Sequence, residues 1–83
     1  MYKVLIADDE AIIREGLGCI VDWKALGYEI CGEAANGEEA LDFLLREKPE
    51  VALLDIRMPK MLGLDVIREA KKQGYNGKII ILS

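Results

Sequence analysis

The chain has 83 residues, of which 52% are hydrophobic, and it carries a net charge of −4 with no histidine. This length allows one small domain, and this composition allows a core and excludes a disordered tail. The acidic balance argues against a nucleic-acid surface, no apolar run is long enough to span a membrane, and the lack of both histidine and a Cys-x-x-Cys pair argues against zinc.

The first residues and the two cysteines bear on cellular location. Residues 1–4, Met-Tyr-Lys-Val, are already strand-like, so we expect no signal peptide. Cys19 and Cys31 lie in otherwise apolar surroundings, which favours two reduced, buried thiols over a disulfide or a metal site. Both observations predict a cytoplasmic protein that does not contact a membrane.

The first third of the chain predicts a strand, a helix and a second strand. Residues 3–7, Lys-Val-Leu-Ile-Ala, form an apolar run typical of a buried strand. Apolar residues then recur at helical spacing, which predicts a helix over 11–22 with an apolar face that Trp23 extends. The residues of that face are Ile13, Leu17, Ile20 and Val21. Gly27 breaks the chain, and residues 28–33 suit a second strand with polar edge character.

A second helix is expected to begin at a turn and to end at a proline. Asn36-Gly37 is a turn signal, and Asn36 with Glu39 forms an N-cap pair. A stripe that faces the core follows at Ala40, Leu41, Leu44 and Leu45. Arg46 and Lys48 complement the helix C-terminus, and Pro49 prevents continuation.

The last third predicts a strand, a helix and a strand. Residues 51–54, Val-Ala-Leu-Leu, read as a third strand buried on both faces. A further helical stripe begins at Leu64, Ile67 and Ala70, and Gly74 is a good residue to end that helix. Residues 78–82 form a fourth strand. Connections of this length imply parallel strands joined by right-handed crossovers.

Carboxylates follow two of the predicted strands. Asp8, Asp9 and Glu10 come directly after the first strand, and Asp55 ends the third. Parallel sheets place their chemistry at this edge, and clustered carboxylates suit a hard cation such as Mg²⁺. Taken alone, Asp8 could be only an N-cap of the first helix. Its pairing with Asp9 opposite Asp55 favours a cation site in which one aspartate could accept a phosphoryl group.

The chain resembles the receiver domain of two-component response regulators. The matching stretches are the first strand with its acidic pair, the start of the second helix, and the loop after the third strand: residues 3–10, 34–41, 55–59 and 63–65. Residues 22–23 and 27–30 are similar to the branch whose output is usually an AraC-type DNA-binding domain. The resemblance covers the whole chain and implies a flavodoxin-like, three-layer α/β fold with a parallel sheet of strand order 2-1-3-4.

The resemblance also implies roles for individual residues. Asp55 would take a phosphoryl group from a partner histidine kinase. Asp9 and Asp55 would supply side-chain oxygens to Mg²⁺, Asp8 would act mainly through a coordinated water, and the backbone carbonyl of Arg57 would be a further ligand. Ser83 falls where the family has a Ser or Thr that hydrogen-bonds the phosphoryl group. Such a domain is not an enzyme beyond catalysing its own phosphorylation and dephosphorylation.

The chain departs from the family pattern after the fourth strand. Family members continue through a fourth helix, a fifth strand and a fifth helix, and the loop after the fifth strand carries a lysine that contacts the phosphoryl group. Lys78 cannot replace it, because it begins the fourth strand at the end of the sheet opposite Asp55. Leu62 stands where the family often has a polar residue. We therefore expect one truncated receiver domain over residues 1–83, with any DNA contact made by an output domain outside this sequence.

Two other kinds of function remain as alternatives. The chain could be an interaction module or a folding fragment that self-associates and is not phosphorylated. A phosphatase of the haloacid-dehalogenase type is disfavoured because Arg57 stands where its second acid belongs, and a cobalamin-binding module would need a histidine. The missing fifth strand leaves residues 79–82 at an edge, which predicts a homodimer through that strand or through an exposed helical face.

Overall fold

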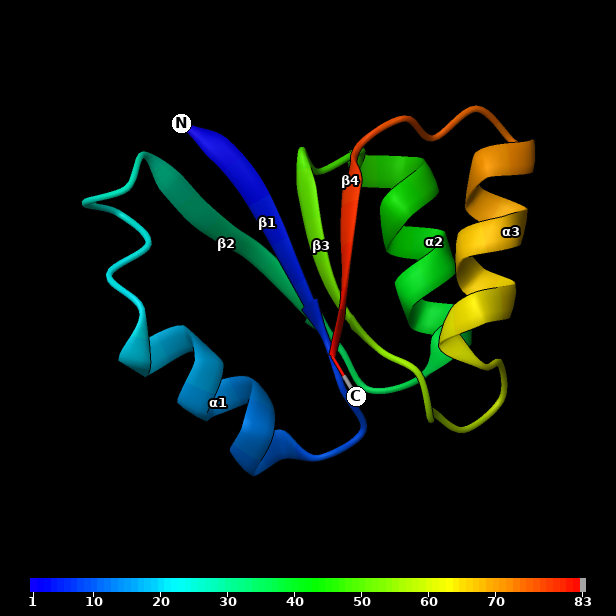
Figure 1. The fold of residues 1–83 in the computed structure, drawn as a ribbon, viewed down its shortest axis with the longest axis horizontal. Coiled ribbons are helices and arrows are strands. Elements are labelled where there is room, and N and C mark those ends of the chain that lie inside the picture. Colours follow the sequence, from blue (N-terminus) through cyan, green and yellow to red (C-terminus); the bar gives the residue numbers. More distant parts are fainter. Residues whose placement is uncertain (83) are drawn as a thin grey trace.

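The computed structural model describes residues 1–82, in which strands and helices alternate (Figure 1). The strands are β1 (Tyr2–Ala7), β2 (Tyr28–Ala34), β3 (Val51–Asp55) and β4 (Lys78–Leu82). The helices are α1 (Ala11–Ile20), α2 (Gly37–Glu47) and α3 (Gly63–Lys72). Every element predicted from the sequence is therefore present, and α1 ends two residues before the predicted position.

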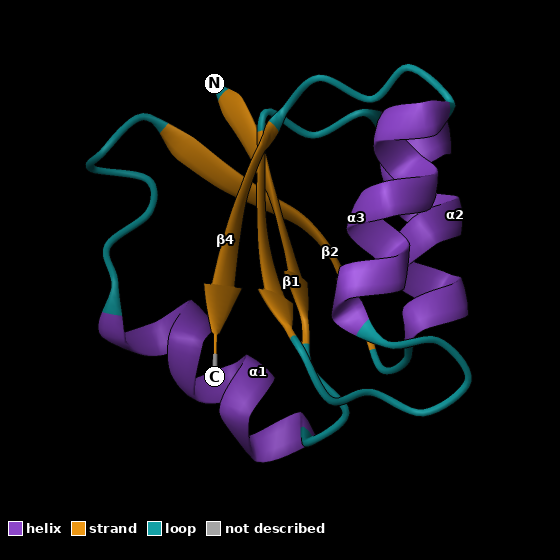
Figure 2. Cartoon of the chain, turned by 45° about the vertical axis from the view of Figure 1, so that its right-hand side comes forward, coloured by secondary structure: helices purple, strands orange, loops and turns teal. Residues whose placement is uncertain are grey.

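The four strands form one parallel sheet in the order β2-β1-β3-β4, as the resemblance implied. Helix α1 covers one face, and α2 and α3 cover the other, so the molecule has three layers (Figures 1 and 2). Lys78 pairs with Val51 at one end of the sheet, whereas Leu82 pairs with Asp55 at the other. The prediction that Lys78 lies at the end opposite Asp55 is thus confirmed.

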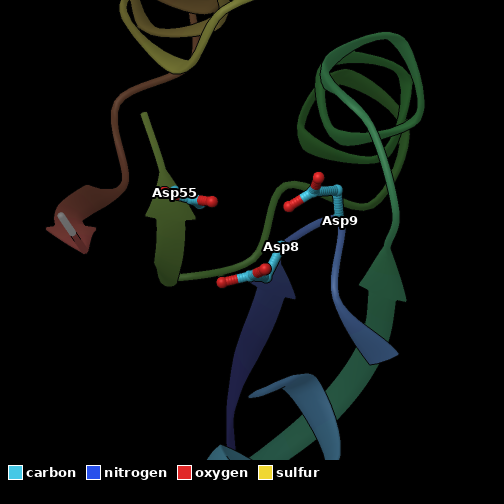
Figure 3. A group of neighbouring side chains, drawn as sticks. All are labelled: Asp8, Asp9 and Asp55. Atoms are coloured by element: carbon cyan, nitrogen blue, oxygen red, sulfur yellow. The ribbon is translucent and has the colours of Figure 1, made fainter. Parts of the chain in front are cut away.

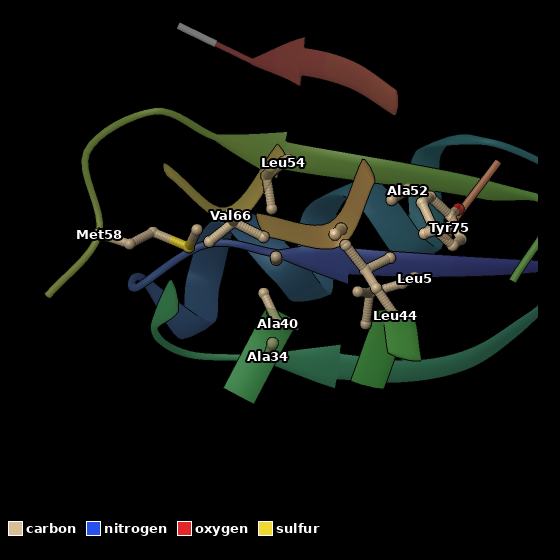
Figure 4. Close-up of a cluster of buried hydrophobic side chains, with 11 residues drawn as sticks. Leu5, Ala34, Ala40, Leu44, Ala52, Leu54, Met58, Val66 and Tyr75 are labelled. Carbon is tan, nitrogen blue, oxygen red and sulfur yellow. The ribbon is translucent and has the colours of Figure 1, made fainter. Parts of the chain in front are cut away.

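The larger core lies between the sheet and the pair α2 and α3 (Figure 4). Side chains from three strands and both helices are fully or almost fully buried there, among them Leu5, Leu54, Leu44, Val66 and Ala70. Tyr75 closes this core at the end away from the carboxylates, and its hydroxyl donates to the Pro49 carbonyl at 2.6 Å. The core fixes the positions of β1 and β3, which carry the acidic residues.

The buried face of α3 differs from the predicted one at its first position. Leu64 is 55% exposed, whereas Gly63, Val66 and Ala70 are buried and Ile67 packs partly against the core. Leu64 lies two residues before Val66, which places it on the opposite side of a helix with 3.6 residues per turn. The spacing predicted the helix and the inward positions of Ile67 and Ala70 correctly, and it was wrong only for Leu64.

Helix α1 covers its side of the sheet only partly. Leu17 packs on a small cluster built from Val4, Ile6 and Leu53, but no residue of α1 is fully buried. Ile20 is 78% exposed, so the expected apolar face of this helix is only half realised. The helix packs mainly on β1, and on β4 it leaves Ile80 50% exposed while Leu82 packs on the same small cluster.

The loop after α1 is fastened by its aromatic residue. The Trp23 indole N–H donates to the Leu17 carbonyl at 3.0 Å, and the ring meets Tyr28 edge-on. Cys19 is exposed and Cys31 is half-buried, so the expectation of two buried thiols was wrong for Cys19, which lies on the open side of α1. Both cysteines are free, as predicted.

A β-bulge interrupts the pairing of β1 with β2. Val4 pairs with Ile30 and Leu5 pairs with Gly32, so Cys31 is the extra residue. Such a bulge turns the following side chains to the opposite face. Ile30 accordingly packs on the α1 side, and Ala34 belongs to the core under α2 and α3.

Within residues 1–82, no helix has the length and apolarity needed to cross a membrane.

Candidate functional site

The three predicted aspartates converge at the carboxyl edge of the sheet (Figure 3). Asp8 and Asp9 follow β1, and Asp55 is the last residue of β3. Because Ala7 pairs with Leu54, the residues that come next, Asp8 and Asp55, leave the sheet side by side. One carboxylate oxygen of each of the three residues lies within 4.8 Å of the others.

The three carboxylates differ in exposure and in hydrogen bonding. Asp8 is only 6% exposed, Asp55 is half-buried and Asp9 is exposed. The backbone N–H of Glu10 donates to Asp8 Oδ1 at 2.9 Å, which engages one of the two oxygens of that carboxylate. Glu10 occupies the N-cap position of α1, so the reading of Asp8 as a simple N-cap was wrong. Asp9 and Asp55 are the more open carboxylates.

The loop after β3 folds back over Asp55. The Arg57 N–H donates to Asp55 Oδ1 at 3.4 Å, and the Gly63 N–H donates to the Ile56 carbonyl at 2.8 Å. A Cβ atom at Gly63 would overlap the Asp55 carbonyl, so this close approach requires glycine. The Met58 side chain is buried in the core, which confirms that it packs the loop.

An arginine on α1 that the sequence analysis did not single out contacts the backbone of the acidic residues. Arg14 Nη1 donates to the Asp8 carbonyl at 2.6 Å, and Arg14 Nε donates to Glu33 Oε1 at 3.0 Å. Its side chain is only 17% exposed. A sequence signal was available, since Arg14 is the only cationic residue within α1. Its partners lie on two different strands, however, and no helical spacing rule reaches them.

One nearby basic residue does not join the cluster, and one predicted residue is not described. Lys60 follows the Asp55 loop, but its ammonium lies 3.9 Å from Glu38 Oε1 at the start of α2, and both side chains are largely exposed. Ser83, the predicted phosphoryl contact, lies outside the described residues. Within the described part of the chain, Arg14 is the cationic residue that hydrogen-bonds to a member of the cluster, through the backbone carbonyl of Asp8.

The site opens into a cavity of about 340 Å³ on the α1 side of the sheet. Its lining combines the carboxylates of Asp8, Asp55 and Glu10 with the apolar side chains of Ile13, Leu17 and Leu82. The donor set is made only of oxygens, and Mg²⁺ binds such ligands through one or two carboxylates while it keeps several waters. The residues present thus fit a small hard cation with room for a bound group beside it.

A family model described as the response regulator receiver domain matches residues 4–83. Among curated proteins, the chain is 39% identical over 83 residues to the transcriptional regulatory protein YesN of Bacillus subtilis; the match covers 100% of this chain and 23% of YesN. The family match contains the acidic residues, helices α1, α2 and α3, strands β2, β3 and β4, and β1 from Val4 onward.

Solved structures give the same result. The REC domain of AraT, a response regulator from Geobacillus stearothermophilus, matches with a TM-score of 0.90 and 45% identity over 96% of this chain and 62% of that one. A CheX–CheY complex with BeF₃ and Mg²⁺ from Borrelia burgdorferi matches with a TM-score of 0.85 and 30% identity over 96% of this chain and 60% of that one. The chain spans less than two thirds of the length of each of these three relatives.

Proposed function

The chain belongs to the response regulator receiver domain family, and from this premise we propose that it accepts a phosphoryl group on Asp55 from a histidine kinase. The observation that carries the proposal is the convergence of three carboxylates at the ends of β1 and β3. A module with an idle acidic edge would not need this convergence, because like charges held together in the absence of a cation repel one another.

We assign Asp9 and Asp55 as direct side-chain ligands of Mg²⁺ and Asp8 as a ligand through water. The burial of Asp8 and its bond from the Glu10 N–H support the indirect role. Arg57 would add its backbone carbonyl, and its N–H already lies 3.4 Å from Asp55 Oδ1. The relative from Borrelia burgdorferi whose structure includes Mg²⁺ supports this choice of cation.

In the proposed reaction, a carboxylate oxygen of Asp55 attacks the phosphorus of a phosphohistidine. The new O–P bond forms as the N–P bond breaks, and the imidazole leaves with the electron pair. When it is bound, Mg²⁺ neutralises charge on the phosphoryl oxygens. Asp55 is held for this attack by the end of β3 and by the Arg57 N–H, and the residue lines the cavity. Ser83 would hydrogen-bond the transferred group.

The biological setting follows from the resemblance and is part of the proposal. Residues 1–83 form one receiver domain, and the output that it controls is transcriptional, which the match to YesN supports. DNA would be contacted through an output domain and not by this segment. A cytoplasmic location fits a domain that receives its phosphoryl group from a histidine kinase.

Self-association is the finer part of the proposed set of partners. Strand β4 is a sheet edge with no charged residue after Lys78, and Ile80 is 50% exposed. Open, apolar edge strands pair with other chains. We propose a two-fold dimer through β4 or through the exposed apolar face of α1.

Intact mass spectrometry after incubation with acetyl phosphate and Mg²⁺ tests the phosphoacceptor role. The wild-type chain should gain one phosphoryl group, and Asp55→Asn should gain none. Asp42→Asn, which changes an exposed aspartate on α2, serves as a matched control and should be labelled normally. A folded wild-type chain that stays unlabelled would favour the interaction module.

A further inference from the structure

Arg14 connects the acidic cluster to two strands at once. Nη1 donates to the carbonyl of Asp8, which directly follows β1, and Nε donates to Glu33 on β2. The Asp8 N–H in turn donates to the Ala34 carbonyl at 3.0 Å. The backbone of Asp8 is therefore held on both sides, by β2 through its N–H and by α1 through its carbonyl.

We propose that Arg14 is a positioning residue that aims the Asp9 carboxylate into the cation site. The peptide group that joins Asp8 to Asp9 is planar, so the bond from Arg14 to the Asp8 carbonyl also fixes the N–H and the Cα of Asp9. Asp9 is exposed and has little packing of its own to hold it. The inference rests on the proposed function, in which Asp9 is a direct ligand of Mg²⁺.

Glu33 holds the Arg14 guanidinium in place by accepting a hydrogen bond from Nε. An arginine offers several donors in one rigid plane, so it can serve Glu33 and the Asp8 carbonyl together. A lysine ammonium carries the same charge on a flexible stem without that fork. Arg14→Lys thus removes the positioning and keeps the positive charge.

Charge and positioning make opposite predictions for cation binding. If Arg14 acted only as a nearby positive charge, its removal would strengthen Mg²⁺ binding, because like charges repel. If it positions Asp9, both Arg14→Lys and Arg14→Met should weaken binding. The sign of the change in Arg14→Met therefore separates the two roles.

The main experiment is a titration with Mg²⁺, followed by NMR, of the wild-type chain, Arg14→Lys and Arg14→Met. We expect the Mg²⁺ dissociation constant to rise about tenfold in Arg14→Lys, as is common when a residue that orients a metal ligand is lost. A parallel titration with Ca²⁺ should show a smaller loss, because Ca²⁺ accepts irregular geometry and Mg²⁺ does not. Arg46→Lys, which changes an exposed ion pair on α2, is the matched control.

A test without any metal makes the result independent of the proposed function. In Arg14→Lys the Asp9 amide should shift and exchange its hydrogen faster, whereas amides of α2 should not change. Glu33→Gln should have a weaker effect of the same kind, and it keeps the inference testable should the Arg14 variants fold poorly. An unchanged Asp9 amide, or unchanged or stronger Mg²⁺ binding in the Arg14 variants, would overturn the inference. If the wild-type chain binds no Mg²⁺, the proposed cation site fails, and the Asp9 amide still decides whether Arg14 holds this backbone.

Discussion

Among single residues, the three aspartates of the site are not equivalent. Asp8 is buried and engaged by the Glu10 N–H, whereas Asp9 is exposed. We expect Asp8→Asn to weaken Mg²⁺ binding about tenfold, as for a ligand that acts through water, and Asp9→Asn to weaken it more. Titration with Mg²⁺ followed by NMR measures both constants. An Asp9→Asn variant that bound Mg²⁺ as tightly as the wild-type chain would contradict the assignment.

Tyr75 provides a residue whose contribution to stability depends on pH. Burial, with smaller effects from Glu50 and Cys31, raises the pKa of its phenol to about 12, and its hydroxyl donates to the Pro49 carbonyl at 2.6 Å. The unfolded value is about 10, so the neutral phenol stabilises the fold fully below about pH 10. That stabilisation is lost as the pH rises through about 12, because the unfolded chain releases the proton first.

Tyr75→Phe should therefore change both the stability and its pH dependence. At neutral pH we expect a loss of about 1–3 kcal/mol in the free energy of unfolding, since the buried Pro49 carbonyl loses its donor. Between about pH 10 and 12 the wild-type chain should lose more stability than Tyr75→Phe. Urea denaturation at neutral pH and at pH 11 measures the difference, with Tyr2→Phe as a control at an exposed tyrosine. Equal losses in the wild-type chain and in Tyr75→Phe would argue against a neutral, buried phenol.

Among the helices, α2 and α3 begin in different ways. The Asn36 side chain accepts from the Glu39 N–H at 2.9 Å, and Glu39 Oε1 accepts from the Ala35 N–H, which confirms the predicted cap. At the N-cap of α3, Leu62 makes no side-chain hydrogen bond and is half-exposed. In the first turn of α3, the N–H groups of Gly63 and Asp65 donate to backbone carbonyls, which leaves the Leu64 N–H for a polar side chain at position 62.

A polar residue at this position should stabilise α3. Leu62→Asn is expected to raise the free energy of unfolding by about 1 kcal/mol through the added cap. Leu62→Ala removes the same apolar side chain without adding a cap, so it is the matched control. Urea denaturation compares the variants, and equal stability of Leu62→Asn and Leu62→Ala would show that the backbone is already satisfied there.

How far the sequence predicted the structure differs from element to element. Strand positions and order were predictable, because apolar runs bounded by turn residues and the receiver motifs identify them. The buried side of α3 was not, because Leu64 and Val66 are equally apolar and only the packing against α2 selects between them. The bulge at Cys31 lies beside Gly32, and a glycine inside a strand is a signal for a bulge that the sequence analysis did not use, so the change of face along β2 was not predicted.

The candidate site follows the same division. Asp8, Asp9 and Asp55 were predicted, because parallel strands bring their carboxyl ends to one edge. Arg14 was missed, because its bonds to the Asp8 carbonyl and Glu33 depend on how α1 crosses β1 and β2. Contacts within one element or between the ends of paired strands could be predicted. Contacts that depend on the angle at which a helix crosses the sheet could not.

The two edge strands of the sheet differ in the side chains that they carry: β2 is charged and β4 is apolar. Strand β2 carries Glu29 and Glu33 at its edge, which discourages pairing, whereas β4 presents Ile80 and Ile81. Ile12 and Ile20 of α1 are exposed as well. A chain of this size has little stability to offset such exposure, so burial by a second copy is favourable.

We expect light scattering to show a dimer that forms as the concentration rises. Ile80→Lys should keep the chain monomeric if β4 is the interface, because a lysine on an edge strand blocks pairing. Ile12→Lys changes the exposed face of α1 and should have this effect only if that face is the interface. A wild-type chain that remains monomeric over the whole concentration series would contradict self-association by either surface.

The parallel sheet also decides how the domain would respond to mechanical force. The first strand begins at one end of the sheet and β4 finishes at the other, as the parallel directions of β1 and β4 illustrate (Figure 1). A pull between these points runs along the strands, so the backbone hydrogen bonds of the ladder carry the load together instead of opening one after another. If the domain were pulled at both ends, the acidic residues after β1 and β3 would therefore keep their arrangement until the hydrogen bonds between β1, β3 and β4 break.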